Sequence, residues 1–117
     1  QMDPYININK YEAKLITKWP GPHTWIVPTV LTPSWITGKN KSVALRVSNH
    51  PVIKEICNRF EGAMVSTSAN IHGERLLKTK KEIQGTFAGL TIVDGDIGTL
   101  SSSTPIQDMI TNEWIRK

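Results

Sequence analysis

The sequence contains a single cysteine, Cys57, so no disulfide can form within the chain and nothing indicates an oxidising compartment. Cys57 falls in a helical pattern, which predicts a buried and unreactive thiol. No apolar run approaches the roughly 20 residues that a membrane helix needs, and no signal peptide opens the chain. These absences predict a cytoplasmic protein without a membrane segment.

Several common catalytic signatures are also missing. Neither a G-x-x-x-x-G-K-[ST] loop nor a G-x-G-x-x-G loop occurs. The three histidines, His23, His50 and His72, are not spaced as metal ligands, and one cysteine cannot complete a zinc site, so no metal site is expected. No serine lies in a nucleophile motif with a histidine, so no residue is assigned to covalent catalysis.

The 117 residues fit one domain, and 38% hydrophobic content is ordinary for a globular protein. The net charge of +4 is uneven, because residues 1–81 carry twelve basic side chains against five acids and residues 82–117 carry two against five. The densest basic cluster is Arg75, Lys78, Lys80 and Lys81. An RNA-binding patch and a solvated surface are both open interpretations of this cluster.

Apolar periodicity and turn residues predict an α/β domain with an antiparallel edge near its C-terminus. The expected helices cover residues 7–16, 51–60 and 79–87. The first has an asparagine cap candidate, Asn7, the second has Pro51 in its first turn, and the last has a capping box from Thr79 to Glu82. Gly62 is expected to end the second helix, and residues 29–41 to form a turn-rich connection. The expected strands cover residues 24–27, 42–47, 63–67, 90–93, 106–110 and 113–116, with a turn at 111–112.

Small polar side chains occur at the end of one predicted strand and at the beginning of another. Val65-Ser66-Thr67-Ser68-Ala69-Asn70 turns from apolar residues into hydroxyl and amide groups, and alternation along a strand would place Ser66 and Ser68 on one surface. Upstream, Trp19-Pro20-Gly21-Pro22-His23-Thr24 forms a rigid turn into a strand. Hydroxyls and amides bind polar ligands without adding charge, so this pair predicts a polar small-molecule site.

Arg46 interrupts an otherwise apolar strand, where an unpaired guanidinium would be costly to bury. It either forms a salt bridge to an acid on a neighbouring helix or binds the carboxylate or phosphate of a ligand. Both interpretations stay open from the residues alone. By default Thr24 is an ordinary strand residue, and Arg116 is a solvated side chain near the terminus.

Four segments in order carry a resemblance: W-P-G-P-x-T, V-A-L-R-V-x-N-H-P, V-S-T-S-A-N-I-x-G-E and S-T-P-I-Q-D followed by W-I-R. Their order and spacing resemble the YrdC/Sua5 family, especially its short, single-domain bacterial TsaC type. The resemblance covers the chain from Trp19 to Arg116. It implies a YrdC-like twisted mixed β-sheet with flanking helices around a concave, basic cavity.

The resemblance also implies a nucleotidyltransferase, a threonylcarbamoyl-AMP synthase. Such an enzyme converts L-threonine, bicarbonate and ATP into threonylcarbamoyl-AMP and pyrophosphate, for the threonylcarbamoyladenosine modification of tRNA. Magnesium would accompany the ATP phosphates. The implied partners are RNA or tRNA and the proteins that transfer the threonylcarbamoyl group to tRNA.

By the same resemblance, threonine would contact Arg46, Ser66 and Thr104. The nucleotide would contact Ser68, Asn70 and Arg116, with Thr24 and Ser42 as weaker correspondences. Thr104 stands where the family usually has serine, and it keeps the hydroxyl.

One departure from the family is large. Family members begin with a Y-P-T-E-T-like strand and a K-x-R motif that line the same cavity, and neither occurs in residues 1–117. We therefore expect a single YrdC-like domain whose N-terminal portion is missing and which is deficient in catalysis by itself. The alternatives are an RNA-binding or regulatory module without catalysis, and a non-functional fragment.

Overall fold

The computed structural model describes residues 1–99 and 102–117. The glycine, serine and threonine residues from Gly98 to Thr104 predict a loop, and this segment lies partly outside the described residues. The chain divides into two units. The first comprises Gln1–Ala63 together with the C-terminal segment up to Lys117, and the second comprises Met64–Thr99. Each unit is described by itself.

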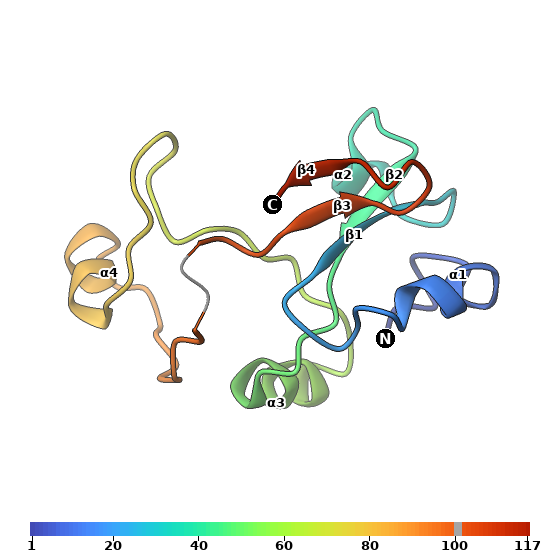
Figure 1. Ribbon diagram of the computed structural model, residues 1–117. Helices are drawn as coiled ribbons and strands as arrows, with labels where there is room; N and C mark the ends of the chain where they lie inside the picture. The colour runs from blue at the N-terminus through green and yellow to red at the C-terminus, as the bar shows by residue number, and fades with distance from the viewer. Residues whose placement is uncertain (100–101) are drawn as a thin grey trace. The chain divides into compact units, whose positions relative to one another are not determined.

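A four-stranded mixed sheet forms the centre of the first unit (Figure 1). Its strands are β1 (Thr24–Pro28), β2 (Ser42–Leu45), β3 (Ile106–Asp108) and β4 (Trp114–Arg116), in the order β2-β1-β3-β4. β1 runs antiparallel to β2 and parallel to β3, and β3 runs antiparallel to β4. The predicted α/β class and the antiparallel C-terminal edge are both confirmed.

One face of this sheet carries the core. Trp25 and Val27 alternate along β1 and are 3% and 0% exposed, and Val43 of β2 lies opposite Val27. Helix α1 (Ile8–Leu15) contributes Leu15 to the same buried cluster, which Ile6 and Met109 complete. The opposite face of the sheet has no such buried cluster among the described residues, and Thr24, Ile26 and Ala44 on that face are half-buried or exposed.

Local signals explain the ends of the helices in this unit. The Asn7 side chain accepts from the backbone N–H of Lys10 and begins α1, as predicted. Helix α3 (Pro51–Phe60) starts with a proline in its first turn, as predicted, but Glu61 in the left-handed conformation ends it one residue before Gly62. A short helix, α2 (Ser34–Thr37), interrupts the connection expected over residues 29–41.

The second unit holds one helix, α4 (Lys80–Thr86), with both hydrogen bonds of the predicted Thr79–Glu82 capping box. The strands expected over residues 63–67 and 90–93 are wrong, because neither segment forms a strand in the described part of the chain. Val65 is 79% exposed and Val93 60% exposed. An apolar run becomes a strand only where another strand pairs with it, and neither run has such a partner among the described residues.

One further expectation changes. Cys57 is half-buried rather than buried. Its position on α3 therefore gives it more contact with solvent than the helical pattern predicted. Among the described helices, none is long and apolar enough to cross a membrane.

Candidate functional site

Three of the predicted site residues gather at one end of the sheet, on the face opposite the core. Thr24 begins β1, and Arg46 follows Leu45, which pairs with Trp25 in the neighbouring strand. Thr104 lies two residues before Ile106, the partner of Thr24 in β3. Residues opposite one another or two apart on paired strands share a face, so β1, β2 and β3 present these three side chains together.

Hydrogen bonds centre this group on Thr104. Arg46 donates from Nη1 to the Thr104 hydroxyl at 2.6 Å. Arg116 donates from Nε and Nη2 to the Thr104 carbonyl oxygen at 2.9 and 2.6 Å. The backbone N–H of Thr24 donates to the Pro105 carbonyl at 2.9 Å. One threonine thus holds two guanidinium groups and lies beside the start of β1.

We name Arg46, Thr104 and Arg116 the arginine site. Among the described residues, neither arginine forms an ion pair with a carboxylate. The salt bridge to a helix that was one interpretation of Arg46 is therefore not found in this part of the chain, and Arg116 is not simply a solvated terminal side chain. Two guanidinium groups that converge without an acid form a place where a carboxylate or phosphate would be bound by several N–H donors.

A shift in strand register delivers Arg116 to this face. Ile106 pairs with Arg116 while the next residue, Gln107, pairs with Trp114, which leaves Ile115 as an extra residue in β4. Simple alternation would put Trp114 and Arg116 on the same face of the sheet. The extra residue reverses the alternation, so Trp114 lies on the core face and Arg116 on the face of Thr104.

Sequence reasoning missed the aromatic group behind the arginine site. His23 is 6% exposed, and its ring centroid lies 4.4 Å from that of Trp25 and 5.7 Å from that of Trp114. Burial, and secondarily the charge of Lys18, lower the pKa of His23 below 6.5. The signal was available, because His23 continues the alternation of Trp25 and Val27 toward the N-terminal end of β1.

Of the remaining predicted residues, only Ser42 belongs to the same unit as the arginine site. Ser42 pairs with Pro28 at the far end of β1, four residues from Arg46 and therefore about 13 Å along the strand. Ser66, Ser68 and Asn70 belong to the second unit. The two serines are exposed and lie on no strand, so their expected alternation is wrong. Asn70 donates through Nδ2 to the carbonyls of Ile71 and Glu74, which shapes its own loop.

The basic cluster of the second unit is partly neutralised. Arg75 forms an ion pair with Glu82 at 2.6 Å, and Lys80 forms one with Asp94 at 3.2 Å. The bonds from Lys78, Arg75 and Thr79 lower the pKa of Glu82 from 4.5 to about 2, so this carboxylate stays charged at neutral pH. The paired half of the cluster therefore supports the interpretation as an ordinary surface.

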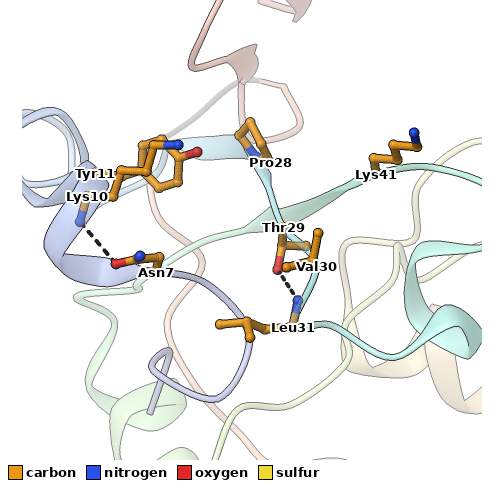
Figure 2. Close-up of a pocket in the computed structure, with 8 residues that line it drawn as sticks. All are labelled: Asn7, Lys10, Tyr11, Pro28, Thr29, Val30, Leu31 and Lys41. Carbon is orange, nitrogen blue, oxygen red and sulfur yellow. Dashed lines mark hydrogen bonds between the residues drawn. The ribbon is translucent and has the colours of Figure 1, made fainter.

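A cleft of about 390 Å³ lies elsewhere in the first unit, where β1 ends (Figure 2). It is lined by Asn7, Lys10, Tyr11, Pro28, Thr29, Val30, Leu31 and Lys41. The Lys10 ammonium lies 5.2 Å from the centroid of the Tyr11 ring, and the two side chains end close together in Figure 2. None of the predicted site residues lines this cleft. No group of three His, Cys, Asp or Glu side chains that would hold a metal occurs among the described residues, either here or at the arginine site.

The sheet and the arginine site define an α/β domain in which two arginines and a threonine hydroxyl lie on the face of the sheet opposite the core. The family model described as "Telomere recombination", for Sua5, YciO and YrdC proteins, matches residues 1–117. The chain belongs to this Sua5/YciO/YrdC family.

Two curated relatives are named threonylcarbamoyl-AMP synthase. They come from Yersinia pestis (strain Pestoides F) and Yersinia pseudotuberculosis serotype O:1b (strain IP 31758), and each is 37% identical to this chain over 123 aligned residues. Each alignment covers 100% of this chain and 65% of the relative. The chain therefore spans less than two thirds of the length of these relatives.

Proposed function

We propose that this chain forms part of a threonylcarbamoyl-AMP synthase that acts in tRNA modification. The observation that carries the proposal is the arginine site, where two guanidinium groups meet at one threonine without an acidic partner in the described part of the chain. The substrates would be L-threonine, bicarbonate and ATP, two of which carry carboxylate or phosphate groups that bind guanidinium well. The activity for which the two relatives are named supports the same assignment.

In this proposal Arg46 holds the threonine carboxylate, and the Thr104 hydroxyl both orients Arg46 and meets the same ligand. Arg116 contacts the nucleotide from the other side of Thr104. Thr24, at the start of β1, is within one backbone hydrogen bond of the segment that carries Thr104. Ser66 is assigned to threonine, and Ser68, Asn70 and Ser42 to the nucleotide, by resemblance to the family alone.

The chemistry required is mainly alignment and charge neutralisation. A carbamate oxygen must be placed on the α-phosphorus while pyrophosphate leaves, and fixed guanidinium groups stabilise charge there without needing to reorganise. Magnesium would be held by the ATP phosphates and water, since the described residues offer no cluster of protein ligands for it. No residue of the chain is assigned to a covalent step.

Residues outside these 117 would supply the rest of the cavity. The Y-P-T-E-T-like and K-x-R segments that the resemblance places there do not occur in the sequence given. We propose that the activity requires them, within one YrdC-like domain of which residues 1–117 are part. The product would pass, in the cytoplasm, to proteins that transfer the threonylcarbamoyl group to tRNA.

The test compares two arginines of the same chain. Arg46→Ala should weaken L-threonine binding roughly 10- to 100-fold, the effect of removing a charge-assisted hydrogen bond of about 1.5–3 kcal/mol. Arg59→Ala is the matched control, because Arg59 is exposed and pairs only with Glu55 on its own helix. The full-length protein should release pyrophosphate only with threonine, bicarbonate and ATP together. If the full-length protein releases no pyrophosphate and Arg46→Ala binds L-threonine as the wild type does, the proposal is refuted.

The rival function is RNA binding or regulation without catalysis, and Lys78 and Lys81 favour it because neither forms an ion pair in the described structure. Two such lysines predict a log–log salt slope no steeper than about −2 for RNA affinity. Replacing both by glutamine should abolish the slope if the rival is right. RNA binding that is absent or insensitive to salt would exclude it.

A further inference from the structure

We propose that His23 is a positioning residue for the arginine site, because its ring packs against Trp114 on the core face and fixes the β4 register that brings Arg116 to Thr104. This inference rests on the proposed function only in assigning ligand binding to Arg116 and Thr104. His23 itself touches neither residue in the contacts described above. It acts from the opposite face of the sheet.

The first support is how firmly His23 is held. The Trp19 indole donates to the His23 carbonyl at 2.8 Å, and the His23 N–H donates to the Gly21 carbonyl at 2.9 Å. The side chain is 6% exposed and lies edge-to-face against Trp25. A ring fixed at both backbone and side chain is a rigid surface for a neighbouring strand to pack on.

The second support is how weakly β4 is otherwise attached. It has three residues, all exposed, and among the described strands it pairs with β3 alone, with the register shift inside that pairing. Outside that pairing, Arg116 donates to the Thr104 carbonyl. Trp114 is the β4 residue whose ring reaches the core face, and there it meets His23 at 5.7 Å between centroids. If that contact were lost, the extra residue Ile115 would no longer be forced into the strand, and Arg116 would return to the face of Trp114.

The third support is the charge state of the ring. Nε2 of His23 and Nε1 of Trp25 are both buried without a hydrogen-bond partner among the described residues. Two cations act on this aromatic cluster: Lys18, whose charge adds to burial in lowering the pKa of His23, and Lys14, whose ammonium lies 5.6 Å from the Trp25 ring centroid. Glu113 comes immediately before Trp114 and β4, and Arg116 lies two residues after Trp114, at the end of β4. Protonation would give the buried ring a second N–H and would place a positive charge near these two cations. The neutral ring is therefore the form that packs.

The experiment follows the Arg116 Nε–H by nitrogen-15 NMR in the full chain without ligand, with the signal assigned by its loss in Arg116→Lys. In the wild type this proton should exchange slowly at neutral pH, and that protection should be lost as His23 protonates, with a midpoint below 6.5. His23→Phe should keep the protection at acidic pH, because phenylalanine retains a packing ring and cannot protonate. His72→Ala, at an exposed histidine of the second unit, should behave as the wild type.

His23→Ala should lose the Arg116 protection at every pH. Protection that ignores the His23 titration in the wild type, or that disappears in His23→Phe on the same acid curve, would overturn the proposal. The comparison of the wild type with His23→Phe tests the proposal even if His23→Ala does not fold. No substrate enters the measurement, so its failure would say nothing against threonine and ATP as ligands, and their failure to bind would leave this result intact.

Discussion

Replacing Thr104 by valine should isolate the hydrogen bond that links β2 to the segment before β3. Arg46 Nη1 donates to the Thr104 hydroxyl at 2.6 Å, and both residues are half-buried. A buried hydrogen bond to a charged group contributes about 1.5–3 kcal/mol, and partial access of water lowers the expected loss to about 1 kcal/mol. Valine keeps the side-chain shape, and the Thr104 carbonyl keeps both bonds from Arg116.

The assay is urea denaturation followed by tryptophan fluorescence. Thr104→Ser is the control, because it keeps the hydroxyl and should lose less than roughly 0.5 kcal/mol for one half-exposed methyl. A double-mutant cycle with Arg46→Met, which keeps the aliphatic stem, should give a coupling energy of about 1 kcal/mol. A coupling of zero, or equal losses in Thr104→Val and Thr104→Ser, would refute the view that this bond joins the two segments.

Three further outcomes test the structure beyond the arginine site. Val27→Ala should lower the free energy of unfolding by about 2 kcal/mol in a urea titration, because it leaves a cavity in the core. Val30→Ala, at a side chain that is 96% exposed, should change this free energy by less than about 0.5 kcal/mol. Backbone N–H groups of the β3–β4 turn, first that of Thr111, lower the pKa of Asp108 below 3.8. The contribution of this carboxylate to stability is therefore present above pH 3.8 and is lost as the pH falls through its folded-state pKa. Urea titrations across this pH range should show that loss in the wild type and a smaller slope of stability against pH in Asp108→Asn. The pKa of Glu82 is about 2 in the folded chain and 4.5 unperturbed, so the helical circular dichroism from α4 should fall as the pH drops from 4.5 to 2. Glu82→Gln should remove that change, and an unchanged signal in the wild type would contradict the capping box.

Elements fixed by neighbouring residues were predictable from the sequence. The Asn7 cap, the proline start of α3 and the Thr79–Glu82 box each depend on residues no more than three apart, and all three are confirmed. Asn112, in the turn predicted between β3 and β4, adopts a positive φ of 62° that asparagine tolerates better than most residues. Hydrogen bonds between neighbouring residues determine such features, so the sequence alone is enough to predict them.

Strands depend on distant partners, and there the prediction failed in part. The apolar segments at 63–67 and 90–93 have the composition of strands, as does 24–27, but only the last has neighbours on both sides. Composition measures how well side chains suit a pleated surface, not whether another strand is present to receive the hydrogen bonds. The same limit applies to Ser66 and Ser68, whose expected common surface required a strand that is not there.

The arginine site shows a deeper limit of pattern reasoning. Arg46 and Thr104 are 58 residues apart, and they were grouped only through the family resemblance. Strict alternation over Trp114-Ile115-Arg116 would have placed Arg116 on the core face beside Trp114, away from Thr104. One extra residue in β4 reverses that outcome, and nothing in the composition of the segment marks it. The register is instead set by packing across the sheet, where the His23 ring meets Trp114. In the proposed arrangement, Arg116 is thus positioned by a buried histidine some ninety residues earlier in the chain, which explains why neither residue reveals its role when considered alone.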